Sequence, residues 1–175
     1  MNNKALVVNV FGCPGAGKSV AAAWLFAELK QQGIKAELVT EYAKDKVWEE
    51  SHKVLHNQIY VFSKQHHRLK ILLDKVDIII NDSPIIMGLV YDIEDNKYLK
   101  DLAFYEYSKM QNLNFVLNRT TKFQQEGRRH DENQAIFYDQ KIRDLIYDNN
   151  IPFHELEPNK ESYQKMLNLV LKTFK

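Results

Sequence analysis

The segment FGCPGAGKSV, residues 11–20, places glycines between an apolar run and a good helix former. It matches the pattern G-x-x-x-x-G-K-[ST] between a strand-like and a helix-like stretch. Backbone N–H groups can wrap a phosphate chain only where no Cβ blocks the approach, which requires glycine, and a following helix adds its positive end. The pattern therefore predicts a loop that binds the phosphates of a nucleoside triphosphate, formed by Gly12, Cys13, Pro14, Gly15, Ala16, Gly17, Lys18 and Ser19.

The last two residues of this loop carry the chemical groups. Lys18 is expected to reach the β- and γ-phosphates during transfer, and the Ser19 hydroxyl is expected to ligate Mg²⁺. ATP and Mg²⁺ are accordingly the expected cofactors. The alternative is a glycine-rich turn with an exposed lysine. Cys13 is interpreted as a small filler, because the chain has no second cysteine to resolve an oxidised thiol.

Two acidic residues follow predicted strands, Glu41 after AELVT and Asp82 after VDIIIN. Ligands of open α/β sheets bind at the carboxyl ends of the strands, so both residues are candidate catalytic and substrate-binding groups. Either carboxylate could accept a proton from an acceptor hydroxyl, and Asp82 could also hold Mg²⁺. Each residue also has a structural alternative. Asp82 could simply be a turn residue beside the start of a helix, and Glu41 could be an acidic residue that begins a helix.

A long polar gap, residues 119–131, separates two regular patterns. Loops of this length inside a domain are usually functional, and Gly127 supplies a hinge, so the gap predicts a lid. Arg128 and Arg129 are candidate catalytic residues that neutralise the transferring phosphate, and Arg119 is a candidate for nucleotide binding. The alternative is a solvated basic loop paired with nearby acids.

The region from Tyr42 to Leu73 is expected to cover the second substrate. An aromatic and an amide side chain could hold a flat base by stacking and paired hydrogen bonds, and Gln58 and Arg68 are the polar candidates for substrate binding in this region. Its apolar and most aromatic residues, Leu55 among them, are expected to form a core stripe instead.

Five β-like runs alternate with helical patterns, which predicts an α/β fold: a parallel sheet with helices on both faces, in one domain over residues 1–175. The strands are expected at 4–11, 36–40, 76–81, 113–118 and 151–156. The helices are expected at 19–32, 43–73 (as one long or two shorter helices), 84–91, 99–110, 132–149 and 162–174.

The bulk composition limits the classes of partner. A net charge of +1 with interspersed acids and bases disfavours a dedicated duplex binder, and it leaves open the alternative of a nucleic-acid strand end bound in a pocket. No secretory signal and no membrane-spanning run are expected, and the single cysteine suits a reducing cytoplasm.

The motifs GCPGAGKS, TEYAKD, NDSP and NRTTKFQQEGRR resemble those of small P-loop kinases common in tailed-phage genomes, often labelled AAA-type ATPases. These are similar to the ribosylnicotinamide kinase domain and, more distantly, to deoxynucleoside and nucleoside monophosphate kinases. The resemblance implies a P-loop NTPase fold with strand order 2-3-1-4-5, and adenine near residues 157–159. Unlike many such kinases, this chain has Ser83-Pro84 rather than an arginine after Asp82.

The leading hypothesis is a Mg-ATP-dependent phosphotransferase acting on a nucleoside, a nucleotide or a related small acceptor. A modified base in phage DNA is one variant of this hypothesis. The alternative from another class is an ATP-hydrolysing switch or assembly ATPase without a small-molecule acceptor. The sequence does not distinguish a monomer from a homodimer. The expected location is the cytoplasm, which is the host cytoplasm if the protein is phage-encoded.

Overall fold

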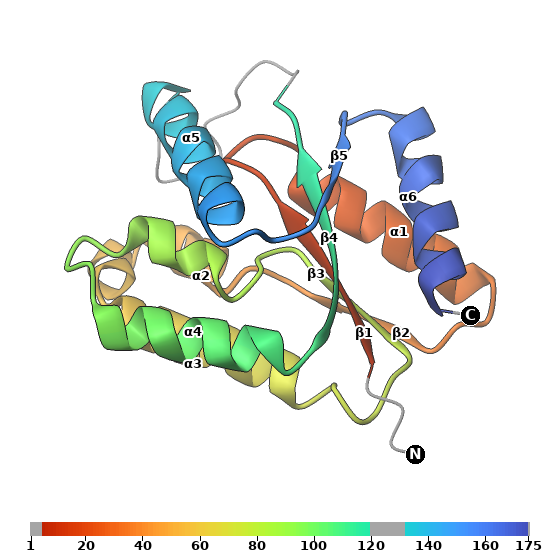
Figure 1. Ribbon diagram of the computed structural model, residues 1–175, viewed down its shortest axis with the longest axis horizontal. Coiled ribbons are helices and arrows are strands. Elements are labelled where there is room, and N and C mark those ends of the chain that lie inside the picture. The colour runs from red at the N-terminus through yellow and green to blue at the C-terminus, as the bar shows by residue number, and fades with distance from the viewer. Residues whose placement is uncertain (1–4, 120–131, 175) are drawn as a thin grey trace.

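The computed structural model describes residues 5–119 and 132–174. Five strands form one parallel sheet in the order β2-β3-β1-β4-β5, which confirms the predicted fold class and strand order (Figure 1). The strands are β1 (Leu6–Phe11), β2 (Ala36–Val39), β3 (Ile78–Asn81), β4 (Gln111–Leu117) and β5 (His154–Leu156).

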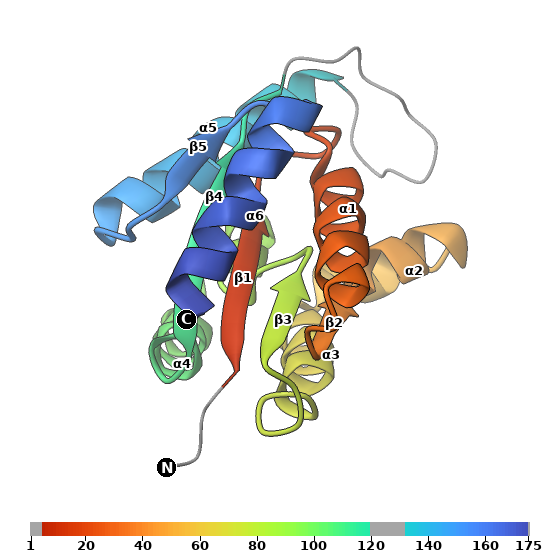
Figure 2. The ribbon, with the colours of Figure 1, turned by 90° about the vertical axis from the view of Figure 1, so that its right-hand side faces the viewer.

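Helices cover both faces of the sheet (Figure 2). One face packs on α1 (Lys18–Gln31) and α6 (Lys160–Phe174), and the other packs on α3 (Gln58–Lys70), α4 (Lys97–Ser108) and α5 (Glu132–Asp148). Successive strand residues point to opposite faces, so Val8 of β1 lies in the first core and Val7 lies in the second. Both faces of β1 are therefore buried, as its apolar sequence predicts.

The predicted helical region 43–73 divides differently from either expectation. It forms α2 (Tyr42–Trp48), a 3₁₀ turn η1 (His52–His56) and α3. Glu50 adopts a left-handed backbone with φ 54°, which ends the first helix, and the Asn57 side chain caps α3 by accepting from the Tyr60 N–H. The break turns Leu55 towards the site described below.

The segment predicted as a helix over 84–91 is instead a turn followed by the 3₁₀ helix η2 (Met87–Tyr91). The Met87 N–H donates to the Pro84 carbonyl oxygen at 2.8 Å, which is the i→i+3 spacing of that helix. Gly88 in the middle disfavours a regular α-helix. A Cβ at Gly88 would lie 3.5 Å from Oε1 of Gln58, so η2 passes close to the start of α3.

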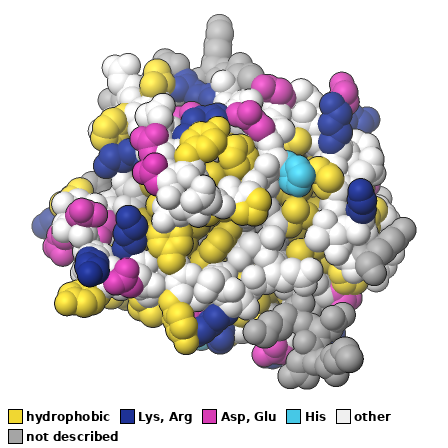
Figure 3. All heavy atoms as spheres, viewed as in Figure 1, with side chains coloured by type: hydrophobic (Ala, Val, Ile, Leu, Met, Phe, Trp, Pro, Cys, Tyr) yellow, Lys and Arg dark blue, Asp and Glu magenta, His cyan; other side chains and the backbone are white. Residues whose placement is uncertain are grey.

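The surface carries charges of both signs. On the face shown in Figure 3, Lys and Arg side chains are interspersed with Asp and Glu, in keeping with the net charge of +1. Among the residues that the structure describes, no helix is both long and apolar enough to cross a bilayer.

The packing of α1 on the sheet gives a test of the core. Leu25 of α1 is fully buried in the core that α1 shares with the sheet and α6, so Leu25→Ala should reduce the free energy of unfolding by about 3 kcal/mol, measured by urea denaturation. Leu102 on α4 is 46% exposed, so Leu102→Ala, the matched control, should change stability by less than about 1 kcal/mol. Equal losses in the two variants would contradict this packing.

Candidate active site

The segment that joins β1 to α1 has the backbone of a phosphate loop. Gly15 and Gly17 have φ values of 88° and 92°, a backbone conformation that residues with a side chain rarely adopt. A Cβ at Gly17 would also lie 3.2 Å from the Cβ of Pro158, in the connection that follows β5. Lys18 is only 8% exposed, and its ammonium donates to the Cys13 carbonyl oxygen at 3.3 Å. The predicted loop residues are therefore brought together with the lysine held across the loop.

Asp82 lies directly beside this loop, because β3 pairs with β1 in the sheet. The Ser19 hydroxyl donates to Oδ2 of Asp82 at 2.6 Å. Burial raises the pKa of the Asp82 carboxyl, while the charge of Lys18 and the hydrogen bond from Ser19 lower it. The carboxylate is thus buried and linked to the first turn of α1.

The other oxygen of Asp82 suggests what this pair could hold. Oδ1 is buried and has no hydrogen-bond partner among the described residues. An unpaired buried carboxylate oxygen is costly, and hydroxyl and carboxylate oxygens are ligands that Mg²⁺ prefers. Ser19 and Asp82 therefore fit a divalent cation next to the phosphate loop.

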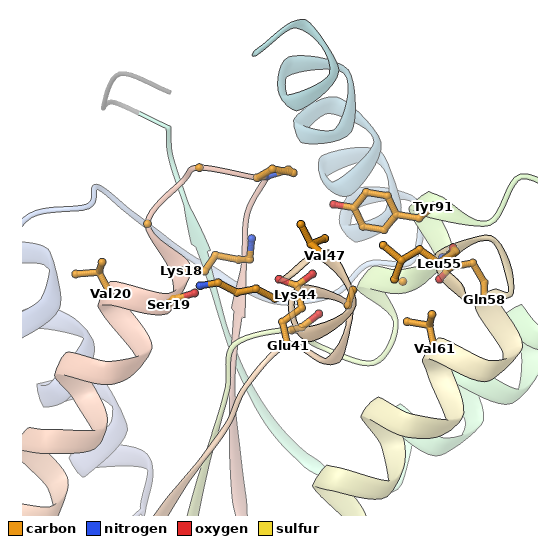
Figure 4. Close-up of a pocket in the computed structure, with 16 residues that line it drawn as sticks. Lys18, Ser19, Val20, Glu41, Lys44, Val47, Leu55, Gln58, Val61 and Tyr91 are labelled. Atoms are coloured by element: carbon orange, nitrogen blue, oxygen red, sulfur yellow. Dashed lines mark hydrogen bonds between the residues drawn. The ribbon is translucent and has the colours of Figure 1, made fainter. Parts of the chain in front are cut away.

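Glu41 follows β2 and occupies the N-cap position of α2. Its backbone is extended, with φ −66° and ψ 120°, yet its side chain makes no capping hydrogen bond. The carboxylate lines the pocket instead (Figure 4). Burial raises its pKa, the charges of Lys18 and Lys44 oppose this, and the charge of Asp82 adds to it.

The phosphate loop and Glu41 open into one pocket of about 260 Å³. Figure 4 shows Lys18 and Ser19 on one side of Glu41, with Gln58, Leu55 and Tyr91 on the other. The far side is mostly apolar and is formed by Val47, Leu55, Val61 and Tyr91, with the Gln58 amide as its polar group. The phosphate-loop end of the pocket and this mostly apolar far side, called the chamber below, therefore meet at Glu41.

Several pocket residues are missed by the sequence analysis. Lys44 lies in the first turn of α2, where the helix dipole disfavours a cation, and this misplaced charge is the signal that could have revealed it. Leu55 is buried in a small apolar cluster with Tyr42 and Val61, as expected for the core stripe, and it also lines the pocket. Tyr91 also lines it and packs against Tyr138 of α5, with ring centroids 4.5 Å apart.

Gln58 and Arg68, the two predicted acceptor-side residues, have different positions. Gln58 is buried at the pocket, and its Nε2 donates to the Leu55 carbonyl oxygen at 2.7 Å. Arg68 does not line the pocket: its guanidinium pairs with Asp45 and donates to the carbonyl oxygen of Thr40 at 3.3 Å. The sequence predicts that Arg68 binds a substrate, but in the structure it forms an ion pair with Asp45 of α2.

The candidate lid is described only at its start. Arg119 follows β4, and its positive charge acts to lower the pKa of the Cys13 thiol in the phosphate loop, against the larger effect of burial. Arg128, Arg129 and the hinge Gly127 lie outside the described residues.

The chain belongs to the AAA domain family, whose model matches residues 7–165. Its fold is that of P-loop NTPases. A deoxyadenosine kinase from M. mycoides, solved with dCMP and dCDP, is similar over 95% of this chain and 97% of its own, at 19% identity and a TM-score of 0.55.

Two further solved structures share the fold. The NadR protein in complex with NR matches at 16% identity and a TM-score of 0.70, over 96% of this chain but only 51% of the NadR chain. Kti12 from Chaetomium thermophilum, in complex with ADP-AlF3, matches at 10% identity and a TM-score of 0.60, over 97% of this chain and 99% of its own. No curated protein matches the chain.

The environment of Cys13 predicts an unreactive thiol. The residue is fully buried, and its burial together with the charge of Asp139 raises the pKa of the thiol to about 11. The thiolate, which is the form that reacts, is therefore scarce at pH 8. Iodoacetamide should label the native protein about 100-fold more slowly than the urea-unfolded control, followed by mass spectrometry. Equal rates would contradict the buried, protonated thiol.

Proposed function

We propose that the protein is a Mg-ATP-dependent phosphotransferase that moves the γ-phosphate of ATP to a hydroxyl of a nucleoside-like small molecule. The observation that carries the proposal is the continuous pocket, with a phosphate loop at one end, a carboxylate at the middle and a mostly apolar chamber beyond. A protein that only hydrolysed ATP would need no chamber on the far side of Glu41.

The residues at the nucleotide end take the following roles. The loop amides and Lys18 bind the triphosphate, and Ser19 and Asp82 hold Mg²⁺, which neutralises phosphate charge when bound. The proposal extends to Arg128 and Arg129 as groups that neutralise charge on the transferring phosphate, and to Arg119 as a nucleotide-binding group.

The two carboxylates are assigned different tasks. Asp82 already accepts from Ser19 and does not line the chamber, whereas Glu41 faces it. Glu41 is therefore the proposed base: the acceptor oxygen bonds to the γ-phosphorus, its proton passes to Glu41, and ADP leaves. Lys44, next to Glu41, would stabilise negative charge at the acceptor side.

The chamber favours a neutral ring-bearing acceptor over a phosphorylated one. Val47, Leu55, Val61 and Tyr91 can pack against a flat ring, and the Gln58 amide can bind its polar edge. Arg68, the cation that could stand in for the arginine absent after Asp82, is engaged with Asp45 and Thr40, and the charge of Lys44 is opposed by that of Glu41. A nucleoside is therefore preferred to a nucleotide.

An acceptor panel tests the proposal directly. Nucleosides, nucleotides and ribosylnicotinamide are incubated separately with the protein and Mg-ATP, and products are analysed by mass spectrometry. The expected result is ADP with an equal amount of one phosphorylated nucleoside-like product. Fast ATP hydrolysis that no acceptor changes would favour the switch ATPase and contradict the proposal.

Single substitutions should separate the assigned roles. Lys18→Ala should weaken Mg-ATP binding measured by calorimetry, because it removes the phosphate-binding cation.

Glu41→Gln should lower kcat by about 100-fold or more at every Mg²⁺ concentration while Mg-ATP still binds. Asp82→Asn should instead raise the Mg²⁺ concentration needed for half-maximal rate. If Asp82→Asn and Glu41→Gln exchanged these effects, the assignment of base and metal ligand would be reversed.

The pH dependence of turnover should report the proposed base. Glu41 must be ionised to accept a proton, and burial raises its pKa above the ordinary value of 4.5. The rate should therefore fall as the pH drops through this raised pKa and reach its plateau above it. A kcat profile from pH 4 to 8 measures it; an acidic limb at or below the ordinary glutamate pKa would contradict the raised pKa of Glu41.

A further inference from the structure

The side chain of Gln65, on α3, holds the backbone on both sides of Glu41. Its Oε1 accepts from the N–H of Tyr42 at 2.8 Å, and its Nε2 donates to the carbonyl oxygen of Thr40 at 3.3 Å. These two peptide groups are the immediate neighbours of Glu41 in the chain. Gln65 is only 5% exposed and does not line the pocket, so it contacts the backbone next to Glu41 from the interior of the protein.

Gln65 also satisfies an N–H group at the start of α2, beside an N-cap residue whose side chain makes no capping bond. An acidic N-cap residue usually folds its side chain back onto the first N–H groups of its helix. Here the Glu41 side chain makes no such bond, and the N–H of Tyr42, the first residue of α2, is satisfied by Gln65. The Glu41 carboxylate is therefore available to the pocket while its backbone is held.

Gln65 is itself anchored by a row of buried amides across the sheet. Asn81, Asn9 and Asn114 occupy matched positions on β3, β1 and β4, and each is at most 2% exposed. Gln65 Nε2 donates to Asn81 Oδ1 at 3.3 Å, and Asn81 Nδ2 donates to Asn9 Oδ1 at 3.1 Å. Asn9 Nδ2 donates to Asn114 Oδ1 at 3.0 Å. The row is buried on the α3, α4 and α5 side of the sheet.

Backbone groups at the two ends determine which way every amide in the row faces. At one end the Tyr42 N–H can only donate, so it requires the oxygen of Gln65. At the other end the Pro152 carbonyl can only accept, so it requires the nitrogen of Asn114, which donates at 2.9 Å. Both ends impose the same direction, and a chain of amides aligned in one direction is mutually polarised and rigid.

We propose that Gln65 is a positioning residue for the phosphotransfer reaction, holding the Glu41 carboxylate in place through the peptide groups of Thr40 and Tyr42. The proposal rests on the proposed function, since it takes Glu41 as the base. A displacement of about 1 Å in a reacting group can cost about 100-fold in rate, which is the scale expected when this support is lost.

The test compares Gln65→Met, which keeps the side-chain length and removes the amide, with Tyr107→Phe as matched control. The Tyr107 hydroxyl donates to Asn114 Oδ1 at 2.7 Å, so its removal also disturbs the buried row but at the end remote from Glu41. Gln65→Met should lower kcat by about 10- to 100-fold with little change in the KM for Mg-ATP. Tyr107→Phe should leave kcat within about 2-fold of the unmodified protein, so a kcat retained in Gln65→Met would overturn the proposal.

A second readout does not depend on activity. In protein labelled with ¹³C at glutamate side chains, the Glu41 carboxyl resonance is assigned by its loss in Glu41→Gln. It should shift or broaden in Gln65→Met and stay unchanged in Tyr107→Phe. An unchanged resonance in Gln65→Met refutes the positioning role whether or not an acceptor is found. A responsive resonance in a protein that phosphorylates no acceptor supports the positioning role and rejects the proposed function instead.

Discussion

The hydrogen bond from Ser19 to the buried carboxylate of Asp82 joins the two parts of the proposed nucleotide-binding end of the site. Ser19 belongs to the first turn of α1 and Asp82 follows β3, and they meet because β1 and β3 are parallel neighbours in the sheet. In a parallel sheet the carboxyl ends of adjacent strands lie at one edge, so the loop after β1 and the acid after β3 share one edge. Without this strand pairing, Lys18 and Asp82 would not lie together at the sheet edge where one ligand is proposed to bind.

The two carboxylates show how contacts, rather than residue type, separate the proposed roles. Burial raises the pKa of both Glu41 and Asp82, and Lys18 and Lys44 oppose the rise in both. Of the two carboxylates, Asp82 accepts a hydrogen bond from the Ser19 hydroxyl of the phosphate loop, and Glu41 lines the chamber. Their electrostatic surroundings are thus similar, and their partners differ.

The buried asparagines run against the usual composition of a sheet interior. Asparagine is depleted in strands, and an unpaired buried amide costs free energy. Here the row is satisfied from Tyr42 to Pro152, so that cost is largely offset. The arrangement links the backbone at Glu41 to the centre of the sheet, and this gives the polar row a place in the proposed function as well as in the fold.

The sequence by itself determined the elements that depend on local physics. The glycines before Lys18 predict the phosphate loop, and apolar runs alternating with helical patterns predict the parallel sheet, because loop curvature and burial pattern are properties of neighbouring residues. The resemblance to P-loop kinases added the strand order. Glu41 and Asp82 could be placed at one sheet edge because each directly follows a strand.

Only the tertiary structure decided how those residues are partnered. Arg68 binds Asp45 and Thr40 rather than facing the chamber, and Leu55 enters the pocket through a break in the helical region that Glu50 and the Asn57 cap introduce. Gln65 reaches the backbone beside Glu41 from 25 positions away along the chain. Such contacts depend on how α3 lies against the sheet, and no local pattern of residue types encodes that.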